Sequence, residues 1–105
     1  MEPETTELVD TLAEAIALLR KYGVAHWANW LEKDKRLIGC SDFYGIEHLL
    51  SAFGGMGSFN DLTICRENGH SIEVKETESV NHRLMNLRNR MYGLAEAIHK
   101  EFNKK

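Results

Sequence analysis

This chain has little proline, little cysteine and no long apolar run, and each shortage excludes a class of structure. Pro3 is the one proline in 105 residues, so no proline-rich linker divides the chain. Two cysteines, Cys40 and Cys65, are too few for the disulfide scaffold of a small secreted protein, which favours free thiols in a reducing compartment. No apolar run approaches the ~18 residues that a membrane span needs, and residues 1–4 are acidic where a signal peptide is basic. We therefore expect a soluble, cytoplasmic protein.

The chain also lacks an excess of positive charge. Its formal net charge of -3 provides no general attraction to nucleic acid or to anionic lipid, which argues against both as partners. The contents of 43% hydrophobic and 28% charged residues are those of an ordinary globular protein. Because two cores would each approach the ~40 to 60 residues at which burial becomes marginal, we expect one domain over residues 1–105.

Apolar residues at steps of three and four predict four helices. The first covers residues 5–22 and ends at Tyr22-Gly23, and the second follows almost directly over 24–37. A third helix has its apolar face between residues 43 and 53, with Ser41 or Asp42 as its cap and Gly54 after its end. The last covers about 79–103, and its apolar stripe predicts the spine of the core: Val80, Leu84, Leu87, Met91, Leu94, Ile98 and Phe102.

Between the third and last helices, alternation of apolar and polar residues predicts a β-hairpin over about 60–75. A three-residue loop over 67–69 pairs Ile64 with Ile72 and Leu62 with Val74, and it places Gly69 in a left-handed conformation. The free edge of this hairpin is then available to a partner or a second copy. The predicted class is α+β and mainly helical, with three N-terminal helices, the hairpin and the long C-terminal helix.

Before this hairpin stands the turn Gly54-Gly55-Met56-Gly57-Ser58-Phe59-Asn60-Asp61-Leu62. Glycines at this density either present backbone N–H groups to an anion or allow the chain to reverse tightly. The turn follows a helix C-terminus and lacks the spacing of a phosphate-binding loop, which favours the structural interpretation, with Phe59 in the core and its polar neighbours bonding nearby backbone. The candidate binding residues of the turn are Gly55, Met56, Gly57, Ser58, Asn60 and Asp61.

Residues 26–31, residues 44–50 and the turn together resemble a small family of uncharacterised bacterial proteins. Its signature is Gly-Gly-Met-Gly-Ser-Phe-Asn-Asp-Leu, and the resemblance covers roughly residues 5 to 65. It implies a bacterial origin and a common fold. It implies no activity, so no functional residues are carried over.

The side chains give little support for a catalytic site or a metal site. Ser58, His48 and Asp61 can be combined into a triad on paper, but no nucleophile elbow is present. Glu96 and His99 have the spacing of a di-iron ligand pair, but the second such pair is missing. We therefore assign no catalytic residue, no metal ligand and no cofactor.

Two further features are binding candidates. Arg83 and Arg90 share a face of the last helix, where they either grip an acidic partner or pair with the acidic side of the first helix. Of Trp27 and Trp30, one is an interface anchor, for which Trp30 is the candidate, or both cap the core.

These features favour a small cytoplasmic bacterial interaction protein that performs no chemistry. It binds a protein partner or itself through the glycine turn, the hairpin edge and exposed aromatic side chains. An immunity or antitoxin-like inhibitor belongs to this class, because a small acidic chain can mask a basic surface. The alternative is a ligand-binding or enzymatic module in which Gly55, Gly57 and Ser58 hold an anionic group with help from Arg83 or Arg90.

Overall fold

The protein is all helical, so the predicted α+β class and its hairpin are wrong. The computed structural model describes residues 2–54 and 56–104, and within them the chain forms no β-strand. Its α-helices are α1 (Pro3–Lys21), α2 (Ala25–Gly39), α3 (Tyr44–Leu50) and α4 (Thr77–Asn103). Three single turns of 3-10 helix, η1 (Phe59–Asp61), η2 (Arg66–Asn68) and η3 (Val74–Glu76), occupy the region where the hairpin was expected.

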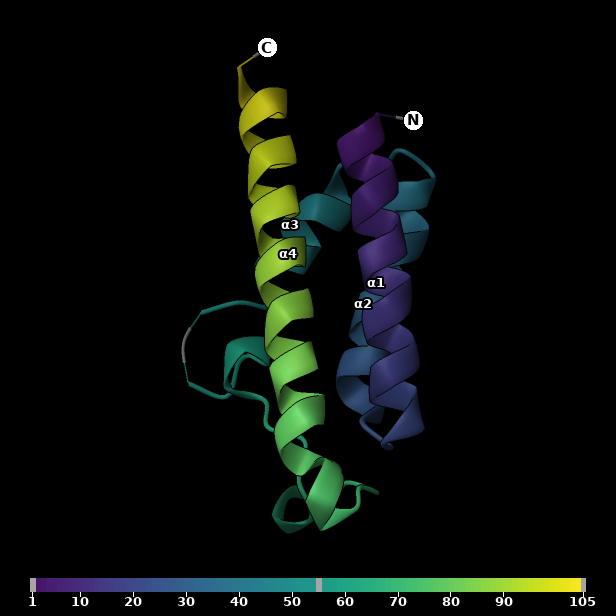
Figure 1. The fold of residues 1–105 in the computed structure, drawn as a ribbon. Helices are drawn as coiled ribbons and strands as arrows, with labels where there is room; N and C mark the ends of the chain where they lie inside the picture. The colour runs from purple at the N-terminus through teal and green to yellow at the C-terminus, as the bar shows by residue number, and fades with distance from the viewer. Residues whose placement is uncertain (1, 55, 105) are drawn as a thin grey trace.

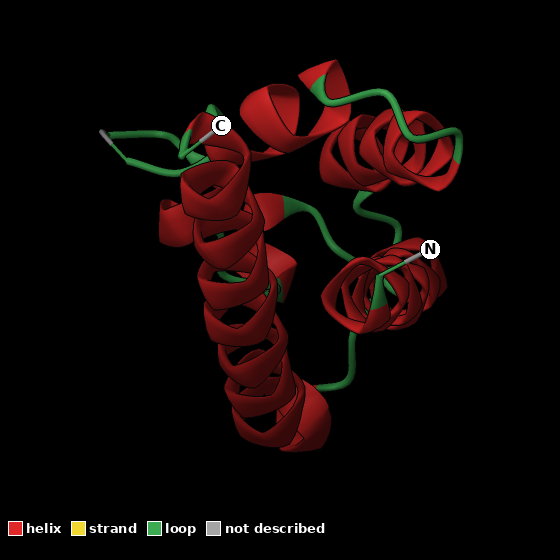
Figure 2. Ribbon diagram, turned by 90° about the horizontal axis from the view of Figure 1, so that it is seen from above, coloured by secondary structure: helices red, strands yellow, loops and turns green. Residues whose placement is uncertain are grey.

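Helix α1 packs against both of the other long helices, α2 and α4. Figure 1 shows α4 running beside α1 in the opposite direction, so that both chain ends lie at the same end of the molecule. Viewed from that end, α2 and α3 lie along one side of the α1–α4 pair (Figure 2). Among the described residues, no helix combines the length and the apolar character needed to cross a membrane.

The apolar stripes of α1 and α4 meet in the core. The apolar stripe of α1 is buried at five positions: Leu8, Leu12, Ala15, Ile16 and Leu19. In α4 the predicted stripe is buried as far as Met91. Beyond it the buried position moves to Ala95, which leaves Leu94 and Ile98 half-buried and Phe102 54% exposed. The last turns of α4 therefore carry apolar side chains outside the core.

The helix ends follow the predicted signals with small shifts. Gly23, with a φ of 77°, makes the tight reversal from α1 to α2 in a conformation that favours glycine. Oδ1 of Asp42 accepts a hydrogen bond from the Tyr44 backbone N–H at 3.0 Å, although the N-cap position of α3 is held by Phe43 and not by Ser41 or Asp42. This helix ends at Leu50, earlier than its apolar pattern suggests.

The hairpin does not form because side chains hydrogen-bond to the backbone N–H and C=O groups that would pair its two strands. The backbone N–H of Ile64 donates to Oδ1 of Asn81 at 2.7 Å, and its carbonyl accepts from Nδ2 of Asn81 at 2.8 Å. The carbonyl of Ile72 accepts from Nε of Arg66 at 2.8 Å. Ile64 and Ile72 are both buried, as their alternation suggested, but each reaches the core from irregular chain.

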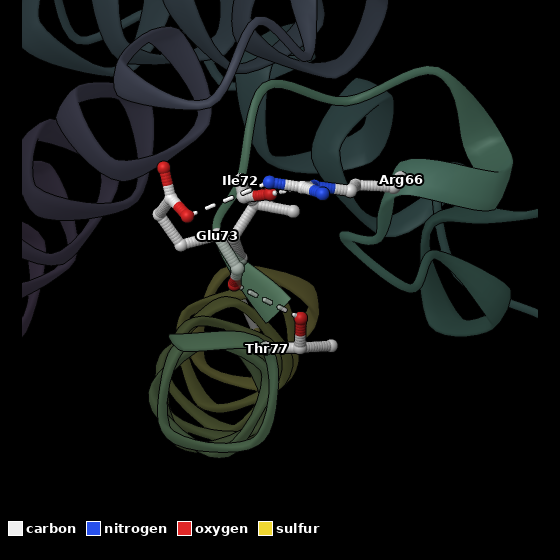
Figure 3. Close-up of polar contacts among 4 residues, drawn as sticks. All are labelled: Arg66, Ile72, Glu73 and Thr77. Carbon is white, nitrogen blue, oxygen red and sulfur yellow. Dashed lines mark hydrogen bonds and ion pairs between the residues drawn. The ribbon is translucent and has the colours of Figure 1, made fainter. Parts of the chain in front are cut away.

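Arg66 holds the end of this segment together, as Figure 3 shows. Besides the Ile72 carbonyl, its guanidinium contacts the Glu73 carboxylate at 3.5 Å, and Thr77 Oγ1 donates to the Glu73 carbonyl at 3.3 Å at the start of α4. Gly69 has the predicted left-handed conformation, with a φ of 83°. Val74, expected on the buried face of the hairpin, is 71% exposed.

Candidate functional site

In the glycine turn, a side chain of the turn itself hydrogen-bonds to the backbone. Gly54 and Gly57 have φ values of 97° and 78°, which explains the glycine at these two positions. The backbone N–H of Gly57, a predicted anion donor, already donates to Oδ2 of Asp61 at 2.8 Å. Gly55 lies outside the described residues. The turn therefore uses Asp61 to satisfy backbone, as the structural interpretation expected.

The remaining residues of the turn divide between core and solvent. Phe59 is fully buried, which confirms its predicted place in the core. Ser58 is half-buried, and its hydroxyl has no hydrogen-bond partner among the described residues. Met56 is fully exposed, and Asn60 faces a shallow hollow of about 410 Å³ that also reaches Gly54 and α4. Asp61 and His48 do not line this hollow.

Arg88, a residue that the sequence argument left unassigned, attaches the turn to α4. Its Nη1 donates to the carbonyls of Phe59 at 2.8 Å and Leu62 at 3.0 Å, and its guanidinium lies 5.8 Å from the centre of the Phe59 ring. Burial lowers the pKa of Arg88, and the Asp61 carboxylate partly offsets this effect. The charge of Arg88 thus serves the fold of the turn.

Arg83 and Arg90 face α1 and not a common site with the turn. Arg83 Nη2 lies 3.8 Å from Glu14 Oε2, and Arg90 Nε lies 3.2 Å from Glu7 Oε2. These ion pairs are the intramolecular arrangement that the acidic side of the first helix suggested. Both are half-exposed, so each adds only about 0 to 1 kcal/mol to stability.

Trp30 belongs to a cluster with a buried carboxylate. Its indole stacks on the His48 ring at 4.2 Å between centroids, and Nδ1 of His48 makes a short contact with Oδ1 of Asp34. Asp34 is fully buried, and its second oxygen, Oδ2, has no hydrogen-bond partner among the described residues. Burial raises the pKa of Asp34 to about 6, although the contact with His48 lowers it in part.

Sequence reasoning missed Asp34 and paired His48 with other residues. The signal was present, since Asp34 stands three residues after Leu31 and four before Ile38, on the buried stripe of α2. An acidic residue on such a stripe requires a partner, and His48 provides one. Trp30 and Trp27 are both half-buried, and Trp27 packs 5.2 Å from the Phe59 ring, so both tryptophans cover the core.

A second surface that the sequence did not reveal lies between the start of α1 and the last turns of α4. We call it the end groove. It has a volume of about 480 Å³ and lies between the start of α1, the α2–α3 connection and the last turns of α4. Its apolar lining is Pro3, Ile38, Phe43, Ile46, Ile98 and Phe102. The Phe43 and Phe102 rings stack at 3.8 Å. The stripe of α4 was assigned to the core, so these residues were not recognised as surface.

The rim of the end groove is acidic. Glu2 and Asp42 border it, and a hollow of about 250 Å³ that shares Glu2, Ile98 and Phe102 with it adds Glu4 and Glu101. None of the described residues that line the two hollows is basic. Apolar lining within a ring of carboxylates distinguishes this end of the molecule from the hollow at the glycine turn, where Arg88 and Glu96 bring opposite charges.

Over residues 2–54 and 56–104, no group of three or more histidine, cysteine, aspartate or glutamate side chains could hold a metal ion. Cys40 is exposed and Cys65 half-buried, and both are free thiols.

Comparison with known proteins places the chain only by family. Residues 20–73 match the model of a family described as a domain of unknown function (DUF6966). The matched region runs from the end of α1 through α2, α3 and the glycine turn to the segment before α4. Neither the curated proteins nor the solved structures gave a match.

Proposed function

From the premise that this chain belongs to the family of the domain of unknown function DUF6966, we propose that it is a protein-binding module that performs no chemistry. Its binding site is the end groove, and its partner presents a basic amphipathic helix. The proposal keeps the interaction function expected from the sequence for a cytoplasmic bacterial protein. It moves the surface from the glycine turn to the meeting point of α1, α3 and α4.

The main support for this proposal is exposed apolar surface that lines a groove. Phe102 is 54% exposed although it stacks on Phe43, and the groove beneath it is lined by further aliphatic side chains. Exposed apolar surface that is concave and rimmed by polar residues is typical of a docking site, and an exposed aromatic side chain is typical of its anchor. A groove between helix ends also suits the apolar face of a partner helix.

The acidic rim of the end groove favours a basic partner. Four carboxylates, from Glu2, Glu4, Asp42 and Glu101, border the apolar lining, so a partner with lysine or arginine on its polar face is complementary. Two copies of this chain joined through the same face would instead bring like charges together, which argues against self-association here. An immunity or antitoxin-like inhibitor that masks a basic helix is one protein of this kind.

The alternative, a ligand-binding or enzymatic module at the glycine turn, has weaker support. Arg88 lies at the hollow beside the turn, which favours an anion. Against this, Arg88 and the Gly57 N–H already have partners within the turn, and Arg83 and Arg90 pair with α1. An anion would have to displace these contacts, so we place this function second.

A designed helix of about 18 residues, or about five turns, tests the proposal. It carries leucine on one face and lysine on the other, and a second helix carries glutamate in place of lysine. We expect fluorescence anisotropy to show binding of the lysine helix, with backbone amide shifts near Ile46 and Ile98. The reverse preference, or shifts confined to the glycine turn, would overturn the assignment.

Matched variants separate the groove from general attraction to an acidic protein. Phe102→Ser should weaken binding by about fivefold or more, because loss of an anchor aromatic costs over ~1 kcal/mol. Met85→Ser, at a 43% exposed position of α4 outside the groove, should leave binding unchanged. Equal effects would show that the groove is not the site. Concentration-dependent dimers that Phe102→Ser abolishes would assign the groove to a second copy instead.

A further inference from the structure

The short helix α3, which forms one wall of the end groove, is fastened to α2 at two places. At its first turn Gly45 lies against α2 so closely that a Cβ there would be 2.8 Å from Leu37 Cβ. Near its last turn His48 contacts Asp34 of α2. Asp34 and Leu37 are three residues apart, so the two contacts follow one side of α2.

The wall of the end groove adjoins these two contacts. Ile46 lies between the two contacts in sequence, and Phe43 precedes α3 directly, and both line the end groove. A helix of seven residues is too short to be stable alone, so the position of α3 depends on its packing against α2 and α4. The state of the Asp34–His48 contact therefore influences the position of Ile46 and Phe43.

The contact itself responds to a proton. Asp34 is fully buried, and its Oδ2 is unpartnered among the described residues, so an ionised carboxylate is held there at a cost that protonation removes. The raised pKa of Asp34 agrees with this geometry. Stacking of Trp30 on the other participant, His48, shields the contact from solvent.

Other titratable groups around α3 must be separated from this pair. On α2, Lys33 lowers the pKa of Asp34 and lies 5.8 Å from the ring of Tyr44, and His26 is 6.2 Å from the Trp30 ring. From the other side, α4 presents Arg88 and Glu96 to the hollow that Leu50 lines, while His99 stacks on Phe43 at 5.5 Å. His26 and His99 are therefore the control positions.

We propose that the Asp34–His48 pair is a proton-operated fastener of α3, which holds the wall of the end groove more tightly at mildly acidic pH than at neutral pH. The fastener is a property of the free protein. Its consequence for affinity rests on the proposed binding function, since it is expressed only if the groove is the docking site. The lysine helix should then bind more tightly at pH 5.5 than at pH 7.5.

Amide hydrogen exchange of α3 tests the fastener without a partner. After correction for intrinsic exchange rates, the amides of residues 46–51 should be about tenfold better protected at pH 5.0 than at pH 7.5, because the closed state binds the Asp34 proton more tightly. Asp34→Asn should abolish the difference, whereas His26→Gln and His99→Gln should keep it. Equal protection of the wild type at both pH values would overturn the proposal, as would loss of the difference in either control.

A wild-type measurement covers the case in which Asp34→Asn fails to fold. A ¹³C NMR titration of the Asp34 carboxyl should give a midpoint near 6, and a midpoint near the ordinary pKa of 3.8 would overturn the fastener. If the protection of α3 depends on pH but the affinity for the lysine helix does not, the proposed effect on binding is wrong and the fastener stands. Absence of any helix binding would overturn the proposed function alone.

Discussion

Asn81 of α4 holds both backbone polar groups of Ile64, and this single side chain takes the place of a neighbouring strand. The carboxamide accepts from the Ile64 N–H and donates to its carbonyl, with a further bond from Nδ2 to the Thr77 carbonyl at 2.7 Å. Ile64 itself is fully buried, so its backbone has no simple access to water. The position of Ile64 on α4 therefore depends on one asparagine.

Replacement of that asparagine should be costly. Asn81→Ala leaves a buried N–H and a buried carbonyl without partners, which should lower the free energy of unfolding by about 2 to 4 kcal/mol. Urea unfolding followed by circular dichroism measures the loss. Asn86→Ala, at an exposed position of the same helix, is the matched control and should change stability by less than about 0.5 kcal/mol. Similar losses in both variants would show that the contact to Ile64 contributes little.

The helices could be predicted from the sequence, and the hairpin could not be excluded by it. Periodic apolar residues placed α1 and most of α4 correctly because such patterns depend on residues close in sequence. Alternation around Ile64 and Ile72 is equally compatible with strands and with irregular chain whose ladder groups bond elsewhere. Asn81 is 17 residues from Ile64, and nothing local to residues 62–74 indicates that partnership.

Arg88 and Arg90 differ in environment and should therefore contribute differently to the free energy of unfolding. Arg88 donates to two carbonyls of the glycine turn segment from a half-buried position, whereas Arg90 makes one exposed ion pair with Glu7. Arg88→Met should therefore lower the free energy of unfolding by about 2 to 4 kcal/mol, since hydrogen bonds from charged groups contribute most.

Arg90→Met is the comparison, and its loss should stay below about 1 kcal/mol. Thermal or urea unfolding of both variants measures the difference. If Arg90 proved the more important of the two, the glycine turn would be held by something other than the Arg88 bonds. The sequence drew attention to Arg90 and not to Arg88, because Arg83 and Arg90 share a helical face. Arg88 has no sequence neighbour that reveals its role.

The pH dependence of stability follows from Asp34. Its folded-state pKa is about 6, against the ordinary value of 3.8, so the folded protein binds the proton at a higher pH than the unfolded chain does. As pH falls from above 6 toward 4, the contribution of Asp34 to stability therefore rises, and above pH 6 the cost of its buried charge is complete.

Asp34→Asn removes this titration while it keeps an acceptor for His48. The stability of the variant relative to wild type should accordingly fall by about 2 kcal/mol between pH 7.5 and pH 4.5. Unfolding in urea at a series of pH values measures the difference, with the exposed Asp10→Asn as the control. A difference that stayed flat, or that rose on acidification, would contradict a buried ionised carboxylate at position 34.

The binding candidates show how far sequence reasoning reached. Ion pairs of Arg83 and Arg90 with α1 and the structural role of Asp61 were among the predicted alternatives, because they involve ordinary local chemistry. The end groove was not, since Phe102 continues the apolar stripe of α4 in the sequence but is 54% exposed in the structure. Whether a stripe residue is core or surface depends on what lies opposite it, which is a tertiary property.

Two glycines in helices should respond oppositely to alanine, and the pair tests the packing of α3 on α2. At Gly45 an added Cβ would lie 2.8 Å from Leu37 Cβ, 2.9 Å from Ile38 Cγ1 and 3.0 Å from the Ile38 backbone nitrogen, while at Gly93 it would meet nothing within 4 Å. Gly45→Ala should therefore lower the free energy of unfolding by about 1 to 3 kcal/mol, because α3 must move away from α2. Gly93→Ala should raise it by about 0.5 to 1 kcal/mol, because alanine favours the helix and no atom has to move. Chemical unfolding of the two variants beside wild type decides the matter, and a stabilising Gly45→Ala would show that α3 does not lie against Leu37 and Ile38 as closely as the structure has it.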